Sequence, residues 1–142
     1  MSAPTDVLQA VAEAIVASLN ADPSITAITG RTGDNIVTWN SLESAKLPVL
    51  VYLLVNAREV GGLNWTWDVD LQLDAYAVVS ADANNLRHAA QQLLISPTFS
   101  ALANPIDAMS LNRVLQTFPF DEASDSYRTS ITMTIRITMP TL

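Results

Sequence analysis

The sequence predicts a single α+β domain spanning residues 1–142, with two main helices packed on one face of a mainly antiparallel β-sheet. Three observations lead to this fold class. Two long segments, 64–77 and 127–139, alternate between apolar and polar residues, as strands with one buried and one free face do. Two others, 6–20 and 82–95, repeat apolar residues at helical spacing. A chain of 142 residues is also long enough to bury a core as one domain.

The strand at 64–77 has the clearest alternation. Its apolar set is Trp65, Trp67, Val69, Leu71, Leu73, Ala75 and Ala77, and its polar set is Thr66, Asp68, Asp70, Gln72, Asp74 and Tyr76. The strand at 127–139 repeats the pattern, with Ile131 and Ile135 on one parity and Arg128 and Thr132 on the other. We therefore expect helices to cover one sheet face and to leave the other free.

The first third of the chain predicts mostly helix. Thr5 or Asp6 can cap a helix that ends before Asp22, which is followed by proline. Residues 24–29 predict a short helical turn, and residues 36–39 a short strand.

Residues 48–57 contain a continuous apolar run from Val49 to Val55. A run without alternation favours a strand buried on both faces, so we expect it near the centre of the sheet. Gly61 and Gly62 then supply a turn into the next strand, which predicts that the two strands are antiparallel neighbours.

The second half begins with a helix that Ser80 or Asp82 can cap and that runs to about residue 95. A helical turn at 99–102, a strand at 109–118 and an acidic loop at 119–126 come before the final strand. The expected element order is α-β-β-β-α-β-β, in which the first strand is short.

The composition argues against several classes of function. The net charge is −7, with fourteen acidic and seven basic residues, so a basic patch for binding nucleic-acid phosphates is not expected. Charged residues make up only 15%, which fits equally a surface that partners partly cover and a small, well-packed domain. There is no cysteine, and the longest apolar run is too short for a membrane span. Residues 1–6 contain no basic region before an apolar segment, so we expect no signal peptide. We expect a soluble protein of a cytoplasm, or of a particle assembled there, without membrane association.

Few residues suggest catalysis. His88 lies in the middle of a predicted helix beside Arg87, without a nucleophile or orienting acid at a recognisable spacing, so we expect a solvated or half-buried helix residue. Four glycines form no phosphate-binding loop. We therefore expect no enzyme activity and no cofactor.

Asp68, Asp70 and Asp74 share one face of a strand, and neighbours two residues apart lie about 7 Å from one another. Such a row suits a hard cation or a pair of glycosidase-like acids. Neither a histidine nor a binding loop accompanies it, so a solvated or interface-facing strand face is the favoured interpretation. Trp65 and Trp67 are candidate interface anchors or core residues, with core favoured for one of them.

Several features together resemble one family. An alanine-rich helix is followed by Asp22-Pro23-Ser-Ile-Thr-Ala-Ile, and a loop leads into Leu47-Pro48-Val-Leu-Val-Tyr52. A long alternating strand runs into Asp82-Ala-Asn-Asn-Leu86, and Asp125-Ser-Tyr-Arg128 opens the last strand. This order, over nearly the whole chain, resembles the tail terminator or tail-completion proteins of long-tailed phages. It is a pattern of elements without a catalytic signature.

The resemblance implies a virion protein at the head-proximal end of a phage tail. Such proteins form a ring, usually of six copies, that caps the finished tail tube and faces a head-side connector or stopper protein. Genome DNA passes through the lumen without specific binding, which fits the acidic balance. The candidate lumen or rim residues are Asp68, Asp70, Asp74, Asp121, Glu122 and Asp125.

Two alternatives remain. One is another neck or head-closure component, or a tail assembly factor that is absent from the finished particle. The weaker one is a small metal-dependent enzyme or ligand-binding domain that uses Asp68, Asp70 and Asp74.

Overall fold

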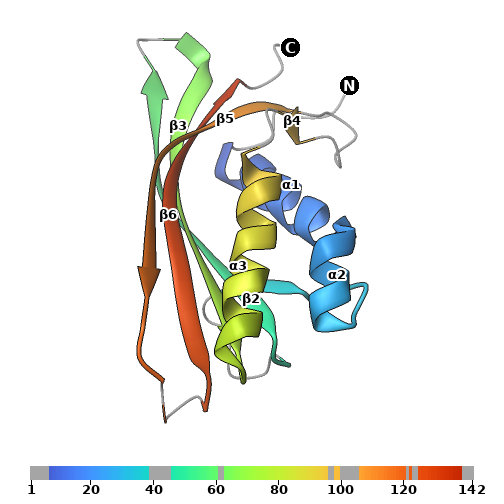
Figure 1. Ribbon diagram of the computed structural model, residues 1–142. Helices are drawn as coiled ribbons and strands as arrows, with labels where there is room; N and C mark the ends of the chain where they lie inside the picture. Colours follow the sequence, from blue (N-terminus) through green and yellow to red (C-terminus); the bar gives the residue numbers. More distant parts are fainter. Residues whose placement is uncertain are drawn as a thin grey trace.

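The computed structural model describes residues 7–38, 46–60, 63–95, 98–99, 106–120, 122 and 125–138. Within them, helices and strands follow the expected order with two additional short elements (Figure 1). The elements are α1 (Val7–Ala21), α2 (Pro23–Thr29), β1 (Ile36–Thr38), β2 (Val49–Val60), β3 (Leu63–Ala77), α3 (Ser80–Leu94), β4 (Thr98–Phe99), β5 (Ile106–Thr117) and β6 (Tyr127–Thr138).

The described strands form one six-stranded sheet in the order β1-β2-β3-β6-β5-β4. β1 runs parallel to β2, and every other neighbouring pair is antiparallel. The longest ladder joins β3 to β6, from Thr66 opposite Thr138 to Ala77 opposite Tyr127. The α+β class and the antiparallel pairing of β2 with β3 are thus confirmed.

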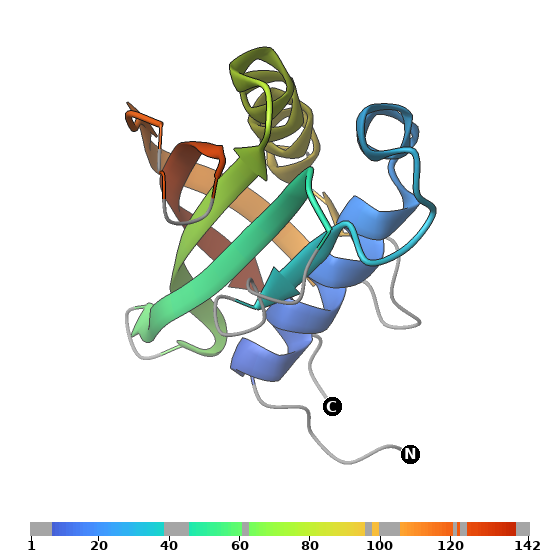
Figure 2. The ribbon, with the colours of Figure 1, turned by 90° about the horizontal axis from the view of Figure 1, so that it is seen from below.

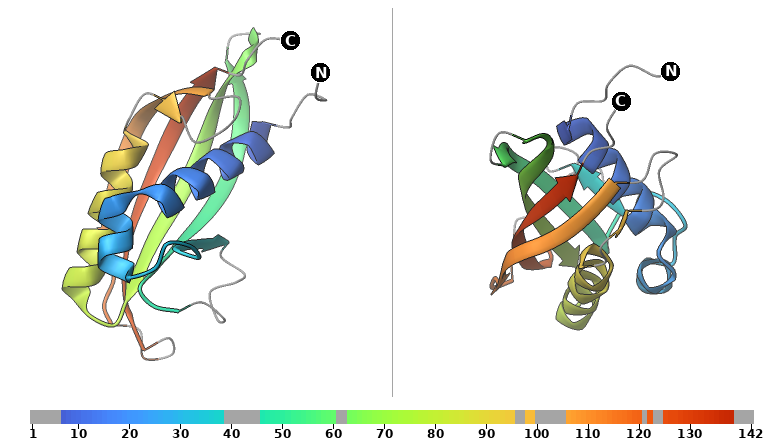
Figure 3. Two further views of the ribbon diagram at one scale, coloured as in Figure 1. Left: turned by 90° about the vertical axis from the view of Figure 1, so that its right-hand side faces the viewer. Right: turned by 90° about the horizontal axis from the view of Figure 1, so that it is seen from above.

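The three described helices lie on one side of the sheet (Figures 1 and 2). α3 packs against β3 and β6, while α1 crosses the strands obliquely and contacts β1, β2 and α3 (Figure 3). The core between the layers consists of fully buried side chains from both: Val11, Ile15, Leu19, Leu86, Ala90 and Leu94 from the helices, and Val69, Leu71, Leu73, Ala75, Ile131, Met133, Ile135 and Ile137 from the strands. The opposite face of the sheet has no helix over it within the described residues.

Of the two predicted helix caps, that of α3 is contradicted and that of α1 lies outside the described residues. The residue before α3 is Val79, in an extended conformation and without a side-chain cap, so the prediction that Ser80 or Asp82 caps this helix is wrong. The chain leaves β3 only two residues earlier, and helical geometry begins at Ser80 itself. Asp82 lies in the first turn, where a carboxylate still interacts favourably with the helix dipole. Thr5 and Asp6 lie outside the described residues.

The prediction that β2 is buried on both faces at the centre of the sheet is wrong over most of the strand. Only Val49, Leu50 and Val51 are buried, and the strand then alternates between half-buried and exposed residues. The physical reason is that β1 is short and pairs only with residues 50–52 of β2, so β3 and β6 occupy the centre instead. The helical turn predicted at 99–102 is also wrong at Phe99, which lies in β4, and residues 100–102 are outside the described part.

Candidate functional site

The free face of the sheet carries a row of aspartates on β3 that is paired with arginines on β2 and β6. In β3, the side chains that alternate with the buried Val69, Leu71 and Leu73 point to this face, as the period of two requires. Three aspartates predicted from the sequence are among them, and three arginines from β2 and β6 lie beside them. We call this group the charge ladder; it consists of Asp68, Asp70, Asp74, Arg58, Arg128 and Arg136.

Asp68 and Asp70 each form a two-bond pair with an arginine. Arg136 lies directly across from Asp68 in the β3–β6 register, and its Nε and Nη2 donate to Oδ1 and Oδ2 at 2.8 and 3.1 Å. Arg58 reaches Asp70 from β2, with Nη1–Oδ2 and Nη2–Oδ1 distances of 2.5 and 3.2 Å. Thr134 Oγ1 also donates to Asp70 Oδ1 at 2.8 Å. The hydrogen bond from Arg58 is the main reason that the pKa of Asp70 lies below its usual range.

Asp74 is the most buried member of the ladder. Its side chain is only 9% exposed, and Arg128 Nε and Nη2 both donate to its Oδ2, at 3.1 and 3.0 Å. Burial raises the pKa of the Asp74 carboxyl, while Arg128 and the amide of Gln72 act in the opposite direction. Arg128 also lies over the ring of Phe118, 4.1 Å from its centroid, so its position is fixed from two sides.

The ion pairs neutralise the aspartates that the sequence predicts on this face. The predicted row of three aspartates is matched by three arginines, so the charge ladder is electrically balanced and the net charge of −7 lies elsewhere in the chain. Among the described residues, no three His, Asp or Glu side chains gather as metal ligands would. The alternation of Arg128 and Arg136 on the polar side of the last strand was the sequence signal for this ladder. The result is a polar surface on which ion pairs connect β3 to β2 and β6.

The second candidate group is the acidic loop between β5 and β6. Glu122 and Asp125 are exposed there, and Asp121 lies outside the described residues. Asp125 has a positive φ of 53°, a conformation that aspartate tolerates in turns. Because β6 begins at Tyr127, this loop adjoins the Asp74–Arg128 end of the charge ladder. The two predicted acidic groups are therefore neighbours at one end of the sheet.

The two tryptophans of β3 differ in how much can be described. Trp67 is half-buried and packs against the core cluster, in line with the expectation that one of the pair is a core residue. The side chain of Trp65 lies outside the described part of the structure, so its role as an interface anchor stays a prediction.

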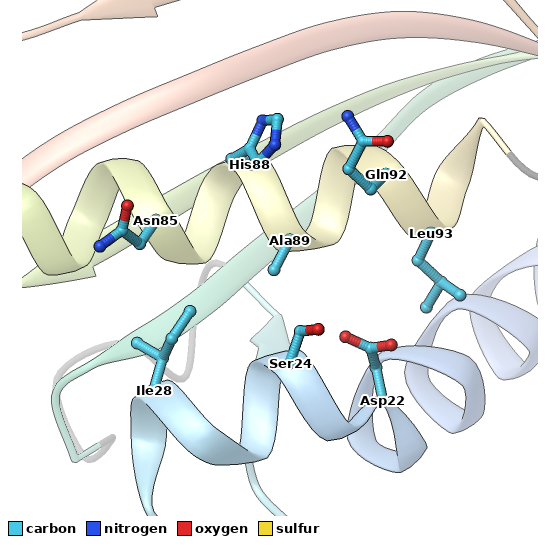
Figure 4. Close-up of a pocket in the computed structure, with 8 residues that line it drawn as sticks. All are labelled: Asp22, Ser24, Ile28, Asn85, His88, Ala89, Gln92 and Leu93. Carbon is cyan, nitrogen blue, oxygen red and sulfur yellow. The ribbon is translucent and has the colours of Figure 1, made fainter.

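An open groove of about 540 Å³ lies between α2 and α3 (Figure 4). Asp22, Ser24 and His88 all line it, a combination that sequence reasoning missed because the helices are far apart in the chain. Asp22 Oδ2 accepts a hydrogen bond from the backbone N–H of Ile25, which caps α2. The exposed His88 points away from Ser24 (Figure 4). The three side chains are therefore not arranged as a catalytic triad.

No described helix has both the length and the apolar character needed to cross a membrane.

These features define a small α+β domain whose free sheet face carries three aspartate–arginine ion pairs. The family model described as "Tail completion protein gp17" matches residues 13–138. The chain belongs to this family and is a structural protein of a phage tail. Its fold is similar to that of a chain in the virion of a native gene transfer agent particle, with a TM-score of 0.63 and 14% sequence identity over 95% of this chain and 99% of that one. No curated protein sequence matches it.

Proposed function

We propose that this protein is a tail terminator, which caps the completed tail tube as a ring, most simply of six copies, and joins the tail to the head. The observation that carries the proposal is the family match over residues 13–138, nearly the whole chain. The proposed partners are other copies of the chain, the tail tube protein and a head-side connector or stopper protein. No step of this role requires catalysis or a cofactor.

The surface chemistry supports passage of DNA through such a ring. A net charge of −7 disfavours tight binding to phosphates. In the charge ladder, Arg58, Arg128 and Arg136 are held by aspartates, so their guanidinium groups are already paired. We place the ladder face, or the adjoining acidic loop with Glu122 and Asp125, at the lumen or rim of the ring. The same pairing weakens the metal-dependent alternative, because each carboxylate of the row already accepts bonds from arginine.

A phage that lacks this gene tests the proposal. We expect heads and tails that fail to join, with tail tubes of abnormal length, and rescue by the gene supplied in trans. Tails of normal length in the knockout would favour another neck or head-closure component. Purified wild-type particles provide the second readout, because an assembly factor would be absent from them and a terminator present.

A further inference from the structure

Within the described residues, the long strands β2 and β5 each have one edge that another strand covers only in part. β1 pairs with β2 only at residues 50–52, and no other described strand lies along residues 53–60. At the other side of the sheet, β4 pairs with β5 only at Ile106 and Asp107, and no described strand lies beyond residues 108–117. Such edges present unpaired backbone groups that another strand can bind.

Both edges expose aliphatic side chains, and on β2 the charges that usually protect an edge strand are confined to Arg58 and Glu59 at the far end of the strand. Leu53 and Val55 of β2 are 38% and 57% exposed, and Val114 and Leu115 of β5 are 55% and 52% exposed. Leu115 lies opposite the buried Ile131, but α3 packs over β3 and β6 and leaves this part of β5 uncovered. Two aliphatic pairs therefore stand at opposite sides of one sheet.

Leu53 of one edge and Val114 of the other lie at the same height along the strands. One row of the sheet runs from Leu53 through Gln72 and Thr132 to Val114. The next row runs from Tyr52 through Leu73 and Ile131 to Leu115. The strand pairing shifts its register beside these rows, between Leu54 and Asn56 in β2 and between Leu111 and Val114 in β5.

The strand directions suit a second copy of the chain. Each step in the series β2, β3, β6, β5 is antiparallel, so β2 and β5 run in opposite directions. A copy displaced sideways by one sheet width brings its β5 beside the neighbour's β2 in antiparallel orientation. The contact joins two different surfaces, and only such a heterologous contact can close a ring of more than two copies.

We propose that the β2 edge of one copy pairs with the β5 edge of the next, so that Leu53 packs against Val114 across each junction of the ring, with Val55 and Leu115 beside this contact. The inference rests on the proposed ring and names the surface through which its copies meet. It joins the sheets of successive copies, and the buried aliphatic pairs supply the apolar part of the contact.

Disulfide trapping in particles tests this pairing, because the chain contains no cysteine of its own. Cβ atoms of directly opposed residues in an antiparallel pair lie about 4.5–5.5 Å apart, close enough for a disulfide after small adjustments. We expect particles carrying Leu53→Cys together with Val114→Cys to give oxidised oligomers extending to the full ring. If neighbouring copies are shifted along the strand direction, we expect Val55→Cys combined with Val114→Cys or with Leu115→Cys to form the disulfide instead.

Two controls separate this interface from chance contacts. Leu53→Cys paired with Val78→Cys should give no series of disulfide-linked oligomers, because Val78 lies directly after β3, away from both edges, and is 60% exposed. Leu53→Cys alone should give no disulfide-linked dimer, and such a dimer would overturn the proposal in favour of a two-fold contact between β2 edges.

Imaging of the tail–head junction separates failure of this inference from failure of the proposed function. A ring at the junction without disulfide oligomers from any combination would overturn the edge pairing and leave the terminator role intact. Particles that lack this protein at the junction would overturn both.

Charge reversal provides a second measurement if the cysteine variants assemble poorly. We expect Leu53→Glu or Val114→Lys alone to lower complementation of the knockout by roughly tenfold or more, because an unpaired charge would be desolvated in the interface. The double variant should recover most of the titre, since the introduced carboxylate and ammonium meet across each junction. A double variant as defective as the single ones would contradict the pairing.

Discussion

The two faces of β3 obey the same alternation but are held by different forces. On one face, Leu71 and Leu73 are fully buried beneath the helices. On the other, Asp68 and Asp70 bond to arginines of neighbouring strands at a partly exposed surface. Burial of apolar area is the stronger term, whereas exposed ion pairs contribute little to stability. We infer that the helix-covered face supplies most of the stability of the fold, whereas the charge ladder gives the free face a polar surface.

The largest expected effect comes from the buried face. Leu71→Ala should lower the free energy of unfolding by about 2–5 kcal/mol, because it removes a fully buried side chain between β2 and β6 and leaves a cavity. Urea denaturation of the purified protein measures it. Leu53→Ala is the matched control at an exposed position and should cost far less. Equal losses in the two variants would contradict the assignment of the core.

The second effect comes from the buried end of the charge ladder. Arg128→Ala should cost about 1–3 kcal/mol, because it leaves the Asp74 carboxylate without its main partner in a site that is 9% exposed. Arg136→Ala, which breaks a more exposed pair with Asp68, should cost much less. Urea denaturation compares the free energies of unfolding of the two variants. A larger loss for Arg136→Ala would contradict the conclusion that the Asp74–Arg128 pair is the more buried one.

A smaller effect is the pH dependence of stability, in which Asp70 and Asp74 differ in sign. The pKa of Asp70 is lowered in the folded state, so its contribution is present above its ordinary value of 3.8 and is lost as the pH falls through the folded value. The pKa of Asp74 is raised by burial, so its contribution is present below 3.8 and is lost as the pH rises through the folded value.

Two isosteric variants separate these contributions. Asp70→Asn should make the decline of stability on acidification shallower, and Asp74→Asn should make the rise of stability above pH 3.8 steeper. Denaturation midpoints measured across this pH range provide the test. Parallel pH profiles for both variants and the wild type would show that neither carboxyl titrates differently on folding.

The sequence predicted those parts of the molecule that local patterns determine. The alternation of β3 placed Leu71 inside and Asp70 outside because the period of two is a property of the strand itself. The pairing of Asp68 with Arg136 depends on the register between strands that are far apart in the chain, and one strand's pattern does not contain that register. The exposed half of β2 was missed because burial there depends on the length of β1.

The central claim is that copies of this chain form a ring at the head-proximal end of the tail. Electron cryomicroscopy of the tail–head junction in purified particles tests it most directly. We expect a six-fold ring of this protein between the tail tube and the head-side connector, with β2 of each copy beside β5 of its neighbour. A junction without this protein, together with a stable two-fold dimer that covers the charge ladder in solution, would contradict it.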